Sequence, residues 1–292
     1  MRTKLRPEVL VMPSEDGGLD LYDLLYERIT SLSPQEAIAF DAGEDEVVKR
    51  LEALVLLEGE HADTLRRQRY ARHKAEVPLH PAPEVEEVDW SLATRWPTFI
   101  SAHWRDGRAL RQLAESRAAG NSMLSLTSFL TRESALELLD ATKALEFERM
   151  DTPWVKASRH ALPARSPLTR WTDFLAREDT RMLFGAILAR PLSATITGNV
   201  WRLDPGDMMP VHNDGRRYHG TCSLGLSRQW SASQGGAIAF GAPEGKGFKV
   251  HTRWLPHLGD LLLFAPRVDS WHAVEPVISG QRTSLTTWWT AA

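Results

Sequence analysis

The chain has 292 residues, a formal net charge of −3, and ordinary proportions of hydrophobic (42%) and charged (25%) residues. This length exceeds what one small core needs, and the composition is that of a folded globular protein rather than a disordered one. The weak negative charge gives no general electrostatic reason to expect nucleic acid or an anionic membrane as a partner. The single cysteine, Cys222, excludes an intrachain disulfide and a cysteine-rich zinc site.

No run of the sequence is long and apolar enough to span a bilayer, and the first residues lack the apolar core of a signal peptide. We therefore expect a cytoplasmic protein. Aromatic residues are used unevenly, with 11 Trp against 4 Tyr. Large aromatic side chains are typical of the interior of a β-structure, although one or two of them could instead line a substrate pocket.

Residues 1–76 are expected to form a small, mainly helical N-terminal domain of α/β or winged-helix type. Short apolar runs at residues 8–12 and 19–22 flank a turn and predict two strands. Ser33, Pro34 and Glu36 are the expected N-cap, first-turn proline and capping-box partner of a helix. Apolar spacing predicts a second helix at 47–57, and the basic stretch at 65–74 is either a solvated helix face or a contact for an acidic partner.

A linker is predicted at residues 77–89, where three prolines precede an acidic run. Residues 90–292 then form the main domain, which is mostly helical to about residue 190. From about residue 194 onward, short β-rich runs alternate with turns, as in a sandwich or barrel. These runs are at residues 195–204, 221–226, 237–241, 248–254, 260–264 and 283–290. The expected fold class is α+β.

Five polar residues in the barrel region have a spacing that indicates chemistry. His212 and Asp214 are two apart at the end of a β-type run, so both side chains can point to one face. His272 follows a buried strand, and Arg282 and Ser284 lie on one face of the last strand. Two histidines and one carboxylate on one side of a metal leave open positions, and this ligand set suits non-haem iron(II). The guanidinium of Arg282 offers a rigid fork that can bind a dicarboxylate.

Other residues repeat this spacing without the strand context. His61 and Asp63 lie in helical sequence, where residues two apart point about 200° apart around the axis and cannot chelate one metal. His257 and Arg267 have the same separation as His272 and Arg282, yet each lies in a turn. Each residue of the predicted site also has a purely structural explanation when it is taken alone, so it is their combination that indicates a site.

Residues of about 123–292 resemble the iron(II)/2-oxoglutarate dioxygenase superfamily, particularly the branch shaped like prolyl 4-hydroxylases. The likeness rests on the His-x-Asp motif after a Pro-Gly-Asp turn, the Gly-Gly-Ala-Ile-Ala-Phe segment at 235–240, the Pro-x-x-Gly-Asp turn at 256–260, and His272 followed by Val-x-x-Gly-x-Arg-x-Ser at 277–284. This resemblance implies a double-stranded β-helix (jelly-roll, cupin-like) barrel at about 194–292, buttressed by the helices of residues 125–190.

The resemblance also implies a site with Fe(II), 2-oxoglutarate and O2. The implied metal ligands are His212, Asp214 and His272, and the far carboxylate of 2-oxoglutarate is expected at Arg282 and Ser284. Hydroxylation or a related C–H oxidation is expected, with decarboxylation of 2-oxoglutarate to succinate and CO2. Halogenating members have a small residue at the position that Asp214 fills.

Met209 departs from the pattern of close relatives, which often carry a Tyr near the cosubstrate at this place. Asn199 or Thr221 is expected to supply that contact here. The competing function is a metal-binding cupin-type enzyme or sensor without 2-oxoglutarate chemistry, and Arg282 argues against it. A peptide-binding adaptor with the barrel as scaffold is a further alternative, which an intact ligand set disfavours.

The substrate is expected to be a peptide, an amino acid or a natural product. Residues that could line its site, or form a solvated barrel rim, are the loop 215–219 with Arg228, Trp230, His251 and Arg253. The N-terminal unit resembles the small winged-helix domains that bind leader peptides in the maturation of ribosomal peptides. A helical cap or a dimerisation domain is the alternative, and the latter would give a homodimer.

Overall fold

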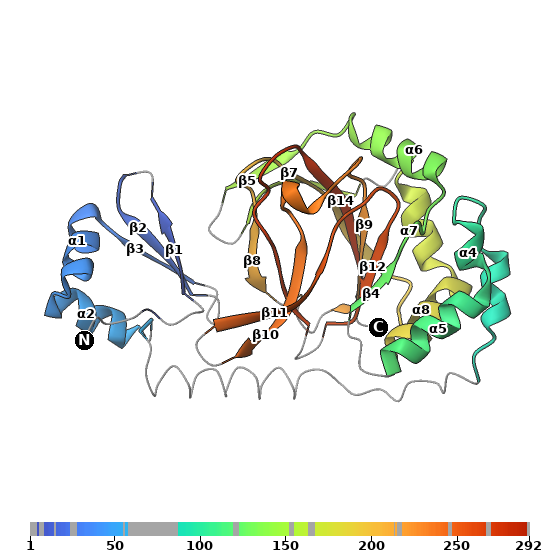
Figure 1. Cartoon of the computed structure of the whole chain (residues 1–292), viewed down its shortest axis with the longest axis horizontal. Helices are drawn as coiled ribbons and strands as arrows, with labels where there is room; N and C mark the ends of the chain where they lie inside the picture. Colours follow the sequence, from blue (N-terminus) through green and yellow to red (C-terminus); the bar gives the residue numbers. More distant parts are fainter. Residues whose placement is uncertain are drawn as a thin grey trace.

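The computed structural model describes residues 5, 9–14, 16–23, 28–54, 56–57, 87–118, 123–151, 155–162, 167–212, 214, 218–244, 247–266 and 270–290. The expected basic helix at 65–74, most of the expected linker at 77–89, and the pair His61 and Asp63 lie outside these residues. The part that is described forms a small N-terminal unit and a barrel covered on one side by helices (Figure 1). None of its helices combines the length and the apolar character needed to cross a membrane.

The N-terminal unit is a three-stranded antiparallel sheet followed by two helices. Its elements are β1 (Val9–Pro13), β2 (Leu19–Asp23), β3 (Arg28–Leu32), α1 (Pro34–Ala42) and α2 (Asp45–Ala53), with sheet order β1-β2-β3. The third strand was not expected from the sequence, so the described part of this unit is less helical than predicted. The second helix ends at Ala53, before the predicted residue 57.

The predicted start of α1 is confirmed. The Ser33 hydroxyl accepts a hydrogen bond from the backbone N–H of Glu36, and the Glu36 carboxylate accepts one from the backbone N–H of Ser33 at 2.8 Å. This reciprocal arrangement satisfies two N–H groups that a helix end leaves without partners. Leu21, Leu32 and Leu51 form a hydrophobic core within the unit that is separate from the two cores of the main domain.

A helical layer leads into the barrel. Its helices are η2 (Trp90–Arg95), α4 (Ala102–Arg105), α5 (Gly107–Ala118), α6 (Arg132–Thr142), α7 (Thr169–Ala176) and α8 (Glu178–Leu188). Helix α6 agrees with the mostly helical character predicted for this region, and the Thr131 hydroxyl is its N-cap. The same stretch also contains three strands that the sequence did not predict: β4 (Met123–Leu126), β5 (Glu148–Asp151) and β6 (Lys156–Ala161).

Two antiparallel sheets form the barrel, as expected for a jelly roll. Its remaining elements are β7 (Ile196–Leu203), β8 (Met209–His212), β9 (Tyr218–Gly225), η3 (Ala232–Gln234), β10 (Ile238–Glu244), β11 (Gly247–Trp254), β12 (Leu261–Phe264), β13 (Trp271–Val274) and β14 (Arg282–Thr290). The larger sheet has the order β4-β12-β9-β14-β7-β6-β5, and the smaller has the order β11-β10-β13-β8. Helices α4 to α8 lie beside the larger sheet (Figure 1).

Strand β12 divides its side chains between two cores. Leu261 and Leu263 pack into the layer between the larger sheet and the helices, whereas Leu262 and Phe264 point into the barrel. All four are buried, which explains why this strand reads as a continuous apolar run. Because successive strand residues alternate between faces, every second residue of a barrel strand reaches the interior where the site lies.

Candidate active site

The two histidines and the aspartate of the predicted metal site converge at one end of the barrel interior. His212 at the end of β8 pairs directly with His272 of β13, and their ring centroids are 4.3 Å apart. Oδ1 of Asp214 lies 3.9 Å from Nε2 of each histidine. One potential ligand atom from each residue lies within 4.8 Å of the others. Asp214 comes after the end of β8, so strand alternation alone does not place its side chain.

Hydrogen bonds from neighbouring groups orient two of these side chains. Thr221 on β9 donates its hydroxyl to Oδ2 of Asp214 at 2.7 Å, which leaves Oδ1 facing the histidines. Nδ1 of His272 lies 2.8 Å from the carbonyl oxygen of Ser270. A carbonyl oxygen can only accept, so Nδ1 carries the proton and Nε2 presents its lone pair. Such outer partners fix ring orientation and tautomer in metal sites.

His272 is suited to metal binding because it is neutral at pH 7. Burial, together with the nearby His212, lowers its pKa to about 4. Phe240 stacks on its ring at 5.2 Å between centroids, and Phe264 meets it edge-on at 5.0 Å. Histidines must be deprotonated to bind a metal, so no proton has to be displaced here. Two imidazoles and one carboxylate are the donor set that fits Fe(II) with open coordination positions.

Arg282 on β14 is a buried cation that no described carboxylate pairs with. Only 1% of its surface is exposed. Nε donates to the carbonyl oxygen of Gly236 at 2.8 Å, and Nη1 donates to Oγ of Ser284 at 2.9 Å. Burial lowers the pKa of its guanidinium to about 10. A buried charge with only neutral partners is costly, and an anionic ligand would relieve that cost.

The Gly-Gly turn before β10 makes room for this guanidinium. Gly235 and Gly236 have φ values of +70° and +66°. A Cβ atom on Gly236 would lie only 2.9 Å from Cδ of Arg282. Glycine is therefore required twice at this turn, for its backbone conformation and for the close approach of the arginine. The Gly-Gly-Ala-Ile-Ala-Phe segment is thus part of the arginine site.

The other predicted cosubstrate residues lie on the same interior surface. Asn199 of β7 is directly opposite Thr286 of β14, in line with the interior-facing Ser284. Thr221 reaches the interior too, but its hydroxyl proton is committed to Asp214. Met209 pairs with Val274 and packs against the core inside the barrel.

The predicted rim residues are not brought together into one site. Trp230 is buried and donates its indole N–H to the carbonyl oxygen of Gly235 at 2.9 Å, so it supports the Gly-Gly turn. Arg253 forms an ion pair with Glu275 at 2.7 Å. Arg228 and His251 are exposed, residues 215–217 lie outside the described part of the chain, and so does Arg267.

Tyr218, from the predicted loop 215–219, forms an aromatic pair beside the metal residues, and its partner, Trp288, was not predicted. Tyr218 stacks on Trp288 with ring centroids 5.4 Å apart, and Trp288 pairs across the sheet with Thr221. A register shift makes His219 an extra residue in β9, and its Nδ1 lies 2.9 Å from the carbonyl oxygen of Pro191. Such bulges re-aim side chains near functional sites. One signal for Trp288 was present in the sequence. It follows Arg282 by six residues, and because an even separation in a strand puts two side chains on the same side, both lie on one face of β14.

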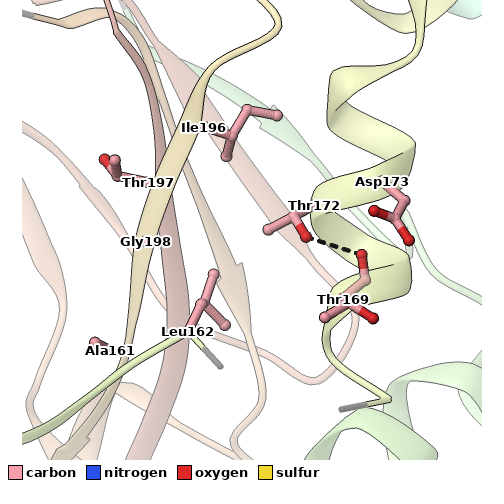
Figure 2. Close-up of a pocket in the computed structure, with 8 residues that line it drawn as sticks. All are labelled: Ala161, Leu162, Thr169, Thr172, Asp173, Ile196, Thr197 and Gly198. Atoms are coloured by element: carbon pink, nitrogen blue, oxygen red, sulfur yellow. Dashed lines mark hydrogen bonds between the residues drawn. The ribbon is translucent and has the colours of Figure 1, made fainter. Parts of the chain in front are cut away.

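A cleft of about 500 Å³ lies elsewhere, between α7 and the neighbouring strands β6 and β7 (Figure 2). It is lined by Ala161, Leu162, Thr169, Thr172, Asp173, Ile196, Thr197 and Gly198. Ile196 packs against the core on the helical side of the sheet, which is the side opposite the three potential metal ligands. Its one carboxylate, Asp173, is exposed. This cleft therefore does not belong to the metal site.

The fold and the site together define a class of protein. A jelly-roll barrel that brings two histidines and a carboxylate together and also buries a guanidinium has the groups that a non-haem iron oxygenase with an acidic cosubstrate needs. Residues 198–290 match the model of the 2OG-Fe(II) oxygenase superfamily. The match covers most of the barrel strands and all three potential metal ligands, and the protein is an enzyme that uses Fe(II), 2-oxoglutarate and O2.

Solved structures show the same fold. A prolyl-4-hydroxylase from Pseudomonas putida is 18% identical, with a TM-score of 0.52 over 63% of this chain and 99% of its own. A prolyl hydroxylase from Trichoplax adhaerens, solved in complex with a peptide fragment of the hypoxia inducible factor oxygen degradation domain, is 16% identical. Its TM-score is 0.50 over 71% of this chain and 96% of its own. No curated protein sequence matches the chain significantly.

Proposed function

We propose that the protein hydroxylates a C–H bond of a peptide, amino acid or natural product, with decarboxylation of 2-oxoglutarate to succinate and CO2. In this proposal His212, Asp214 and His272 hold the Fe(II), and Arg282 with Ser284 holds the far carboxylate of 2-oxoglutarate. The observation that carries it is the combination of three converging ligand atoms with a buried guanidinium that no described carboxylate pairs with. A metal barrel without this cosubstrate would have no use for such a cation.

Each side chain has a task that follows from its contacts. Thr221 holds the carboxylate of Asp214 in one orientation, and Ser270 fixes the tautomer of His272. Phe240 and Phe264 enclose the His272 ring and keep water from that side. When bound, the iron and 2-oxoglutarate activate O2 for attack on the substrate, and the protein orients them and excludes competing reactions.

The carboxylate of Asp214 favours hydroxylation over halogenation. Its side chain is 8% exposed and is turned toward both histidines, so it fills the coordination position that a halide would need. For a halide to bind the metal at this position, residue 214 would have to be one whose side chain offers no ligand atom. We therefore propose that oxygen, and not chloride, is transferred to the substrate.

The stacked Tyr218 and Trp288 are proposed to form one wall of the substrate site. They lie beside Thr221, which contacts Asp214, and large flat rings offer area for a ring or a peptide backbone to pack against. A peptide is the substrate that this wall and the structural neighbours favour, since one neighbour was solved with a peptide fragment.

The N-terminal unit is proposed to capture the substrate. Its own hydrophobic core supports independent folding, and the capping box at Ser33 marks a self-contained helix start. A chain that starts at Trp90 should still consume 2-oxoglutarate slowly but lose stimulation by substrate. An insoluble or metal-free shortened chain would show instead that the unit belongs to the packing of the barrel.

The proposed function is tested by titrating 2-oxoglutarate into the anaerobic Fe(II) protein and following the iron(II) charge-transfer absorption. Arg282→Lys keeps a charge but loses the fork, so the affinity should fall about ten- to a hundredfold, or ~1.5–3 kcal/mol, while iron binding persists. Arg111→Lys is the matched control, because Arg111 forms an exposed ion pair with Glu115 on α5. If all three proteins titrate alike, or none develops the band, the cupin-type alternative is the better explanation.

A further inference from the structure

Trp254, the last residue of β11, has a buried indole N–H without an acceptor. Its side chain is 4% exposed and packs in the core inside the barrel, together with Phe240 and Phe264. Nε1 finds no hydrogen-bond partner among the described residues, as is also the case for Nε1 of Trp96 and Trp288, but Trp254 is the one of these three that packs with Phe240 and Phe264 inside the barrel. A buried polar group without a partner is uncommon and costs stability, so it calls for an explanation such as a bound ligand.

The neighbours of β10 show where Trp254 lies along the barrel wall. Phe240 of β10 pairs with His272, one of the potential metal ligands. Ile238, two residues earlier in the same strand, pairs with Trp254. Gly236, in the turn just before β10, accepts the hydrogen bond from Nε of Arg282. Trp254 therefore pairs with a residue that lies, along the chain, between the partner of His272 and the glycine that contacts Arg282.

The cosubstrate of the proposed function would lie along the same part of the barrel wall. In that function its 2-oxo acid end would be held at the metal residues and its far carboxylate by Arg282, so its methylene carbons would lie between them. Methylene groups accept no hydrogen bond. An indole N–H there can therefore be satisfied only by the far carboxylate or by the chelating end. The far carboxylate has more lone pairs than the fork of Arg282 and the hydroxyl of Ser284 can use.

We propose that Trp254 is a third hydrogen-bond donor to the carboxylate of 2-oxoglutarate that Arg282 holds, an inference that rests on the proposed function. Trp254 then supplies the contact for which the sequence analysis named Asn199 or Thr221. A neutral donor beside the guanidinium fixes the position of the carboxylate without adding a second buried charge. It also explains why a tryptophan occupies this apolar position, because a leucine or phenylalanine would fill the space without donating.

The direct test observes the indole N–H itself. The protein is labelled with ¹⁵N-tryptophan and loaded with Zn(II), which is diamagnetic, and the resonance missing in Trp254→Phe is that of Trp254. Adding 2-oxoglutarate should move this resonance downfield, as a new bond to an anion does. Adding 2-oxobutyrate, which has the same chelating end but no far carboxylate, should leave it nearly unchanged. An unmoved resonance with 2-oxoglutarate bound would overturn the inference.

A second measurement uses affinity. Trp254→Phe keeps an aromatic ring at this position but loses the indole N–H, so 2-oxoglutarate should bind about tenfold more weakly by calorimetry, whereas Zn(II) and 2-oxobutyrate should bind as in the wild type. Trp104→Phe is the matched control, because the Trp104 indole donates to the carbonyl oxygen of Thr127 at 2.8 Å in the helical layer. If Trp254→Phe fails to fold, Trp254→Leu, which also lacks the indole N–H, takes its place in both the assignment and the affinity measurement.

The two proposals fail in different ways. If the wild type binds Zn(II) but not 2-oxoglutarate, the proposed function is wrong, and this inference is wrong with it. If the wild type binds 2-oxoglutarate and Arg282→Lys weakens it, while Trp254→Phe binds it equally well, only the role of Trp254 is refuted.

Discussion

Replacing Thr221 by Val tests whether the Asp214 carboxylate depends on its neighbour. Thr221 is 1% exposed, and its hydroxyl donates to Oδ2 of Asp214 at 2.7 Å. Valine has the same shape without the hydroxyl, so water cannot easily take its place. The carboxylate then loses one charge-assisted hydrogen bond and is free to turn Oδ1 away from the two histidines.

The expected loss follows from that one bond. A hydrogen bond to a charged group contributes about 1.5–3 kcal/mol, which corresponds to a ten- to hundredfold weaker metal affinity. The same range is usual when an outer partner of a metal ligand is removed. The assay is a titration with Co(II), followed by its visible absorption. Thr221→Ser keeps the hydroxyl and should bind within a few-fold of the wild type.

A matched control lies on the neighbouring strand. The hydroxyl of Thr286 is 3.3 Å from that of Ser223 and contacts none of the potential ligands, so Thr286→Val should leave Co(II) binding unchanged. Equal Co(II) affinity of folded Thr221→Val and the wild type would refute the reasoning. If its affinity for 2-oxoglutarate fell instead at saturating metal, Thr221 would be the cosubstrate contact that the sequence analysis expected.

Three further substitutions have defined outcomes. The pKa of Asp207 lies below its ordinary value because, although burial raises it, the paired bonds from Arg149 at 2.6 and 2.7 Å and a backbone N–H lower it more. Its stabilisation is therefore fully present above the unfolded pKa of about 3.9 and is lost as the pH falls through the lower folded value. Asp207→Asn should accordingly lower the free energy of unfolding in urea by ~1–3 kcal/mol at pH 7 and by a smaller amount at pH 2. An equal loss at both values would contradict this. Gly236→Ala should displace Arg282 and weaken 2-oxoglutarate binding about tenfold or more with metal affinity kept, because both the φ of +66° and the 2.9 Å contact oppose a side chain; unchanged calorimetric binding would refute it. Asp214→Gly should abolish hydroxylation, and chlorinated product from the wild type in chloride buffer, detected by mass spectrometry, would contradict the role of its carboxylate.

The metal site could be predicted because residue type, spacing and strand-like surroundings can all be read directly from the sequence. His212, Asp214 and His272 were identified by residue type and order within β-type sequence. Strand alternation alone places Arg282 and Ser284 on one face, where their side chains meet at 2.9 Å. What the sequence does not contain is the direct pairing of β8 with β13, which brings the histidines together.

The missed features depend on contacts between distant parts of the chain. Strand β5 is short, polar and mostly exposed, and it is a strand because it pairs with β6. The bulge at His219 is tied to the carbonyl oxygen of Pro191, 28 residues away. The unpaired indole of Trp254 becomes visible only when its surroundings are known. Short-range patterns carry none of this information.

The alternation along β12 has a consequence for how the enzyme can be divided. The superfamily model matches residues 198–290 only. These residues supply the sheet side of the core between the larger sheet and the helices, but not the helices that cover it. Cut out alone, they would present Leu224, Leu263, Leu285 and Trp289 to water, all of which are now fully buried against the helices. A sheet face of that size without its cover promotes aggregation. The smallest piece expected to fold therefore begins near Trp90, so the barrel and its helical cover have to be expressed and engineered together.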